Sequence, residues 1–181
     1  MKTIYKKYII IFFIFTQLSF TSSHADYPET IVGVVDLNYI LSEAKAAKDA
    51  AKQIEEIAIK IEKEISDSDQ TLLDEQNELV ESQQIMAPAV FDEKRKEYEK
   101  KVQNYNITRQ EKLMSIDVLL ANTRNDLLNA LKPILEEISN ENGITILLEK
   151  NTVLLNAENM DITSKAMKIL NKELPSIEVS N

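Results

Sequence analysis

The sequence lacks cysteine and tryptophan, and its 181 residues include only two glycines, four prolines and one histidine. Without cysteine the chain forms no disulfide and offers no residue for the lipid anchor of a lipoprotein. Sandwiches, barrels and doubly wound sheets need many tight turns, and glycine and proline supply most of them. The shortage of both residues therefore favours long, uninterrupted helices.

The same shortage argues against catalysis and against metal binding. The single histidine, His24, lies in the N-terminal segment described below. A serine with a lysine, or two sheltered carboxylates, would have to carry any reaction, and the acids here occupy helix faces that we expect to be solvated. Asp67 and Asp69 lack the glycine turn of a calcium loop. No glycine-rich loop for phosphate is present, so we expect neither an enzyme nor a bound cofactor.

The first 25 residues have the pattern of a secretory signal peptide. A basic start precedes an apolar run over residues 8–20, and small residues stand at the −3 and −1 positions of a cleavage site after Ala25. The run is shorter than the roughly 20 residues that a permanent transmembrane helix needs. We therefore expect export with cleavage after Ala25, the alternative being an uncleaved anchor.

The chain is acidic, with a formal net charge of −9. Residues 1–25 contain three lysines and no acid, so the rest carries 18 basic and 30 acidic side chains, a net charge of −12. This balance argues against nucleic acid as a partner. Residues 62–81 hold Lys63 as their one basic residue against eight acids: Glu62, Glu64, Asp67, Asp69, Asp74, Glu75, Glu78 and Glu81.

Two long helices are predicted to form a hairpin over residues 46–141. No helix breaker occurs between residues 42 and 87, and Ser42 is a candidate N-cap. A helix over residues 46–84 would be about 58 Å long, which exceeds the diameter of a globule of this size. Pro88 is expected to reverse the chain, while Pro133 lies within a continuing apolar face and predicts a kink.

One face of the second helix repeats every 3.64 residues, which predicts little left-handed supercoiling. Arg109 is the one charge on this face, and we expect it to bond across the hairpin to Glu64 or Asp67. The apolar positions are Tyr98, Val102, Tyr105, Leu113, Ile116, Leu120, Thr123, Leu127, Leu131, Ile134 and Ile138.

Short strands are predicted on either side of the hairpin. Residues 31–36 form a β-branched run before a short helix, and residues 144–149 follow the turn at Asn142 and Gly143. We expect residues 152–156 to pair back as a β-hairpin, and a final helix over residues 164–174. Three short strands are not stable alone, so we expect an oligomer.

The predicted fold is mainly α with a small β component. A body of residues 26–45 and 142–181 carries the hairpin, whose tip lies near residues 85–91, in a single unit over residues 26–181. The candidates for body packing and oligomer contacts are Ile31, Val32, Val34, Val35, Ile144, Ile146, Leu148, Val153 and Leu155.

Apolar side chains near the tip are candidates for contact with a binding partner. They are Ile85, Met86, Val90 and Phe91. The alternative is that they close the turn, and both roles can coexist. Tyr98 and Tyr105, seven residues apart, either pack between the helices or line a cavity.

The order of these elements resembles the Skp (OmpH-like) chaperones over nearly the whole exported chain. The resemblance rests on residues 34–38 with Leu41, on the Ala/Lys-rich start of the hairpin, on residues 143–148 with 153–156, and on Asp161-Ile162-Thr163. It implies a jellyfish-like homotrimer in the periplasm, with three hairpin tentacles around a cavity. Such a protein would hold unfolded outer-membrane proteins without ATP until they reach the insertion machinery.

The acidity departs from this family, whose best-known members have basic tentacles that attract acidic clients and lipopolysaccharide. Like charges slow association, which makes long-range attraction of such clients doubtful here. A near-neutral run over residues 92–101 reads as a paired, solvated helix face, and a weak contact with lipopolysaccharide or a membrane surface is the alternative. The alternative function is a periplasmic coiled-coil adaptor or envelope spacer.

Overall fold

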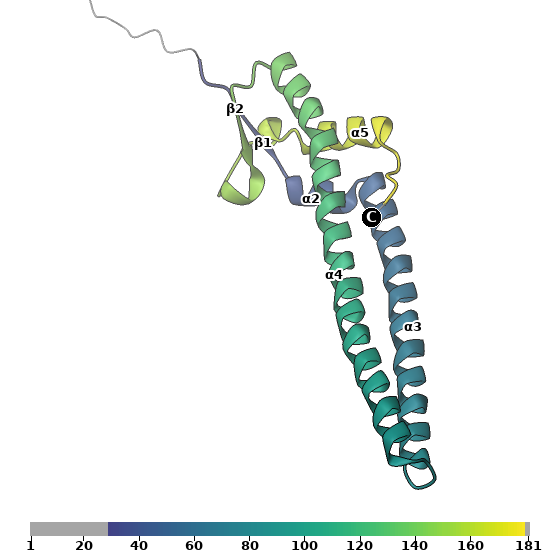
Figure 1. The fold of residues 1–181 in the computed structure, drawn as a ribbon. Coiled ribbons are helices and arrows are strands. Elements are labelled where there is room, and N and C mark those ends of the chain that lie inside the picture. Colours follow the sequence, from purple (N-terminus) through teal and green to yellow (C-terminus); the bar gives the residue numbers. More distant parts are fainter. Residues whose placement is uncertain (1–28, 180–181) are drawn as a thin grey trace, which may run out of the picture.

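The computed structural model describes residues 29–179, and the signal-peptide prediction lies outside them. Two long antiparallel helices project from a small body of strands and short helices (Figure 1). The predicted mainly helical hairpin with a small β component is confirmed. In chain order the elements are β1 (Val32–Val35), α2 (Leu37–Glu43), α3 (Lys45–Ser82), α4 (Pro88–Glu141), β2 (Ile146–Glu149), η1 (Lys150–Thr152), η2 (Glu158–Met160) and α5 (Thr163–Glu173).

The chain reverses where it was expected to, between α3 and α4. Ala87 is extended, with φ −61° and ψ 136°, as the residue before a proline prefers. Pro88 opens α4, where its missing N–H costs no helical hydrogen bond. α4 then continues for 54 residues and passes through Pro133 without ending there.

The first long helix begins in a way that local sequence does not reveal. The prediction that Ser42 caps the long helix is wrong, because Ser42 lies inside α2 and its hydroxyl donates to the carbonyl of Tyr39 at 3.2 Å. Ala44 precedes α3 and offers no side-chain cap. Instead Asn171 of α5 accepts a hydrogen bond from the Lys45 N–H at 2.7 Å. The last helix therefore caps the first long one.

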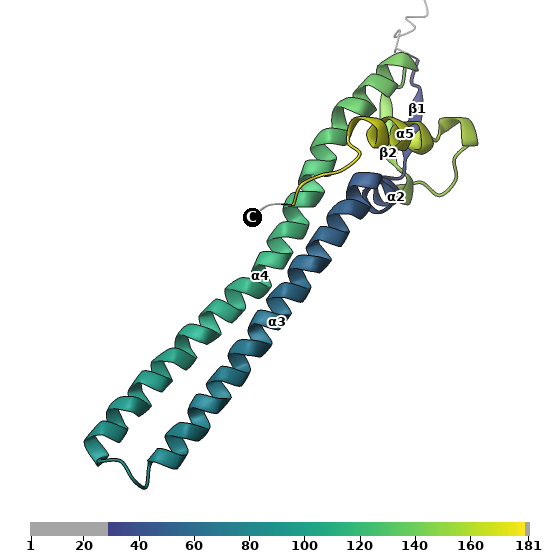
Figure 2. The ribbon, with the colours of Figure 1, turned by 90° about the vertical axis from the view of Figure 1, so that its right-hand side faces the viewer.

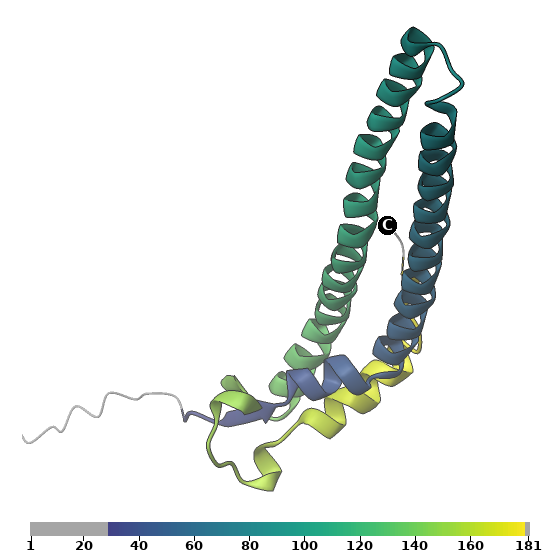
Figure 3. The same cartoon turned by 90° about the horizontal axis from the view of Figure 1, so that it is seen from below.

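The hydrophobic core lies in the body and in the adjoining ends of the long helices. α3 contributes alanines, whose small side chains let α4 approach it closely, and α2 and α5 lie side by side at the base (Figure 3). The fully buried side chains include Ile40, Leu131, Ile138 and Leu170. Between residues 55 and 118, all of which the structure describes, no side chain is buried. The hairpin thus leaves its core near Ile54 and Leu119.

The sheet has two parallel strands, with Val32 opposite Ile146 and Val35 opposite Glu149. On the other edge of β1, Val34 forms a bridge with Asp161, and the Ile162 N–H donates to the Val34 carbonyl at 2.9 Å. β1 is therefore flanked on both sides. A side chain at Gly33 would crowd the sheet, because a Cβ there would lie 2.8 Å from Cδ1 of Ile144, which would have to move.

The predicted β-hairpin between residues 144–149 and 152–156 is wrong. Residues 150–152 form the 3₁₀ turn η1, closed by a hydrogen bond from the Thr152 hydroxyl to the Glu149 carbonyl at 2.7 Å. This turn leads the chain away from β2. The following Leu154 and Leu155 are 96% and 89% exposed.

Candidate functional site

The distal hairpin is joined across its seam by half-buried apolar side chains, such as Ile61, Ile65 and Val102, and by polar contacts. Lys112 donates to Glu64 at 2.6 Å, and Lys101 donates to both carboxylate oxygens of Glu75 at 2.8 Å. The hydrogen bond and charge of Lys112 lower the pKa of the Glu64 carboxyl. The prediction that Arg109 bonds to Glu64 or Asp67 is wrong: Glu64 pairs with Lys112, one turn further along α4, and within residues 29–179 Arg109 forms no ion pair with Asp67.

The two tyrosines lie in this seam, each half-buried. The Tyr105 hydroxyl donates to Asp69 Oδ1 at 2.5 Å and lies 3.2 Å from the carbonyl of Ile65, so it joins α4 to α3. Partial burial, followed by the bond to Asp69, raises the pKa of Tyr105. Tyr98 lies in a shallow groove beside Leu79. These contacts agree with packing between the helices, while a cavity-lining role stays a prediction.

At the tip of the hairpin, the four apolar candidates differ in exposure. Ile85 is 87% exposed and Val90 46% exposed, whereas Met86 and Phe91 are half-buried. The N–H groups of all four residues donate to carbonyls of the reversal, at Ser82 and Ala87, at 3.0–3.2 Å. Only side-chain exposure separates them, so closing the turn stays a prediction for Met86 and Phe91, and Ile85 and Val90 are the exposed pair.

Apolar side chains are exposed along both long helices, away from the tip as well as at it. Leu113 and Leu120, which were expected on the interhelical face, are about half-exposed, and Leu119 is buried instead. The recurrence of apolar residues seven apart outside the seam, as at Leu73 and Val80, was the signal that was missed. The part of α3 and α4 between the body and the tip is called the shaft. Its exposed apolar residues are Ile59, Leu73, Val80, Ile107, Leu113, Met114, Val118 and Leu120.

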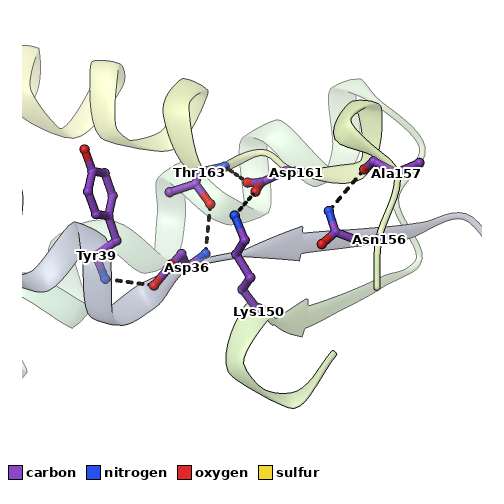
Figure 4. Close-up of polar contacts among 7 residues, drawn as sticks. All are labelled: Asp36, Tyr39, Lys150, Asn156, Ala157, Asp161 and Thr163. Atoms are coloured by element: carbon purple, nitrogen blue, oxygen red, sulfur yellow. Dashed lines mark hydrogen bonds and ion pairs between the residues drawn. The ribbon is translucent and has the colours of Figure 1, made fainter. Parts of the chain in front are cut away.

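Asp161 and Thr163 form a polar network that joins the pieces of the body (Figure 4). The Asp36 N–H donates to the Thr163 hydroxyl at 2.8 Å, and the Thr163 N–H donates to Asp161 Oδ1 at 2.9 Å. Lys150 donates to Asp161 Oδ2 at 2.6 Å. Burial alone would raise the pKa of Asp161, but the hydrogen bonds from Lys150 and Thr163 outweigh it, and the pKa is lowered.

This network predicts an acid-sensitive contribution to stability. A carboxyl whose pKa is lowered on folding stabilises the fold above its unfolded pKa of about 3.9, and the contribution is lost as the pH falls through the lower folded pKa. Asp161→Asn is expected to reduce the free energy of unfolding by about 1 kcal/mol at pH 7, since the Lys150 partner is partly exposed.

Urea denaturation of both proteins at pH 7 and at a pH of about 3 measures this loss. The difference between them should shrink at the lower pH. Asp126→Asn, an exposed acid of α4, is the matched control. A deficit of Asp161→Asn that stays constant with pH would contradict the assignment.

The body candidates divide into buried and outward-facing residues. Val34 and Val35 are buried, and Val32, Ile144 and Val153 are half-buried. The outward-facing ones are Ile31, Ile146, Leu148 and Leu155, joined by Leu154. An open groove of about 680 Å³ lies between α4 and β2, lined by apolar residues such as Leu135 and Leu147.

Within residues 29–179, no three acidic or histidine side chains gather as they would around a metal ion. None of the helices in that range is long and apolar enough to span a bilayer.

Comparison with known proteins gives a family and a fold. The sequence profile described as "Outer membrane protein (OmpH-like)" matches residues 31–170, which include the hairpin and most of the body. No curated protein sequence matches the chain. A solved structure from Caulobacter crescentus CB15, assigned as an outer membrane chaperone (OmpH-like), is similar with a TM-score of 0.76. The two chains are 14% identical, and the similarity covers 89% of this chain and 95% of that one.

Proposed function

Since this chain belongs to the OmpH-like family of non-enzymatic chaperones, we propose that it is a periplasmic, ATP-independent holdase for unfolded outer-membrane proteins. It keeps these clients soluble until they reach the insertion machinery. The observation that carries the proposal is the exposure of apolar side chains along a projecting hairpin, outside the half-buried seam that joins its two helices. Many weak apolar contacts on an adaptable surface suit a client without fixed structure.

The proposal includes a homotrimer, with the body of residues 26–45 and 142–181 at its centre and the hairpin of residues 46–141 as the tentacle. Two strands with exposed leucines beside them are a small basis for an independent body. Contacts between three bodies would cover the groove between α4 and β2 and the outward-facing leucines. Three hairpins would then enclose a cavity for the client.

The tip residues are proposed client contacts. Replacing both Ile85 and Val90 with serine is expected to raise the chaperone concentration needed to suppress porin aggregation about three- to tenfold. The reason is that two exposed apolar side chains are lost. Light scattering of a denatured porin diluted into buffer measures this. Glu93→Ser and Lys94→Ser together are the matched surface control. Unchanged suppression by the tip variant would remove these residues from the client site.

The acidity of the hairpin predicts an unusual response to salt. Acidic clients are repelled at long range, and raising the salt from about 0.02 M to about 0.3 M shortens the screening length from roughly 20 Å to below 10 Å. The fraction of porin held in solution should therefore rise with salt, in contrast to a basic relative.

The same light-scattering assay tests the proposed function itself. The function would be rejected if the chain failed to slow porin aggregation at any salt concentration.

A further inference from the structure

The C-terminal segment after α5 does not leave the molecule but turns back toward the long helices (Figures 1 and 2). Pro175 follows the end of α5 and stops it from continuing. Ile177 packs against the body core, and the side chain of Gln53 on α3 bonds to the backbone on both sides of Glu178. We call residues 175–179 the tail.

The side chain of Gln53 forms hydrogen bonds only with main-chain atoms of the tail. Its Nε2 donates to the Ile177 carbonyl at 2.7 Å, and its Oε1 accepts from the Val179 N–H at 3.0 Å. Nε2 also donates to the Asp49 carboxylate at 2.9 Å, which can only accept, so the orientation of the amide is fixed. The carboxamide thus bonds the C=O of one residue and the N–H two residues later, as a residue in a parallel strand does.

The side chains of the tail follow the alternation of a strand. Ile177 and Val179 are half-buried, whereas Ser176 and Glu178 are exposed. The site therefore has two requirements: an extended backbone with a free N–H, and apolar side chains at alternate positions. Neither requirement specifies a particular sequence. Segments of unfolded outer-membrane β-barrels satisfy both, because their strands alternate apolar and polar residues.

We propose that Gln53 and the surface around it form a binding site for extended peptides with alternating apolar side chains, and that the tail is its intramolecular occupant. The inference rests on the proposed function and names the class of client segment that the base of the hairpin takes. A tethered occupant competes at an effective concentration of the order of millimolar. A client segment must displace the tail, so the tail limits capture to segments that fit well or arrive in several copies along one chain.

Binding of a fluorescein-labelled octapeptide that alternates valine with serine or glutamate tests this by fluorescence anisotropy. The chain from Asp26 is compared with the same chain ending at Pro175. We expect roughly tenfold tighter binding to the shortened chain, as the tethered competitor is gone. A peptide of the same composition with its valines in one block should gain much less affinity when the tail is removed. Circular dichroism and sedimentation check that the shortened chain is folded.

One variant of the full-length chain and one of the shortened chain separate the site from a general effect of truncation. Val179→Pro keeps the tail but removes the N–H that donates a hydrogen bond to Gln53 Oε1. The tail should then compete less well, and peptide binding should again become tighter. Gln53→Leu in the shortened chain should abolish the gain. Its matched control is Gln70→Leu, because Gln70 lies on α3, donates to Asp74 at 2.9 Å and has no contact with the tail.

Equal peptide binding by the full-length and shortened chains, or binding that Gln53→Leu leaves unchanged, would overturn the inference. If both chains then still suppress porin aggregation, the proposed function stands without this site. If the peptide binds as expected while porin aggregates unhindered, the peptide site stands and the chaperone function fails.

Discussion

Replacing Leu131 with alanine is expected to lower the free energy of unfolding by about 3–4 kcal/mol, the largest effect of any single substitution considered for this chain. Leu131 is 0% exposed and lies in α4 within the core that also contains Ile40, Ile138 and Leu170. Truncation removes buried apolar surface and leaves a cavity, because helices from three parts of the chain cannot all close in on it.

Denaturation in urea, followed by circular dichroism at a fixed chain concentration, measures the loss, since stability of an oligomer depends on concentration. Leu120→Ala is the matched control: it makes the same change on the same helix at a side chain that is 51% exposed. Its cost should stay below about 1 kcal/mol. Equal costs at the two positions would show that the core does not lie where the structure places it.

Replacing Leu154 and Leu155 together with serine is expected to shift the proposed trimer to monomers at micromolar concentration. These leucines are 96% and 89% exposed in the single chain and lie in the loop between η1 and η2. Burying two leucines per chain contributes about 1.5–3 kcal/mol each, and a trimer repeats that contribution three times. The loss is therefore large compared with the free energy that separates nanomolar from micromolar association.

Sedimentation equilibrium distinguishes the two states directly. The variant should remain folded, because neither side chain contributes to the core of the single chain. Leu73→Ser, an exposed leucine on the shaft of α3, serves as a control that should leave the trimer intact. A double variant that sediments like the unmodified protein would place the subunit contact elsewhere.

The hairpin was predictable because local signals decide it. Breaker-free sequence before Ala87 and a proline that fits only the first turn of a helix left one arrangement for residues 46–141. The strand at Val32–Val35 and the turn at Gly143, with φ +66°, were likewise encoded within a few residues. Such features need no knowledge of the rest of the molecule.

The errors arose where distant residues decide the outcome. Residues 152–156 have the composition of a strand, yet the turn at Lys150–Thr152 directs them away, and Asp161 occupies the second edge of β1. The cap of α3 comes from Asn171, 126 residues away in sequence. Charged partners across the seam depend on helix rotation, so Lys112 rather than Arg109 bonds to Glu64. The bonds of Gln53 to the tail had no signal in the sequence.

The point at which burial ends along the hairpin is expected to decide how easily each part of the hairpin bends. Below Ile54 and Leu119 the two helices are joined by exposed ion pairs and half-buried contacts, which open at little free-energy cost. We therefore expect the hairpin beyond Ile54 and Leu119 to bend more easily than the body. In the proposed trimer, such hairpins would splay to admit clients of different size while the bodies stay folded, so breadth of clientele would follow from where the core ends.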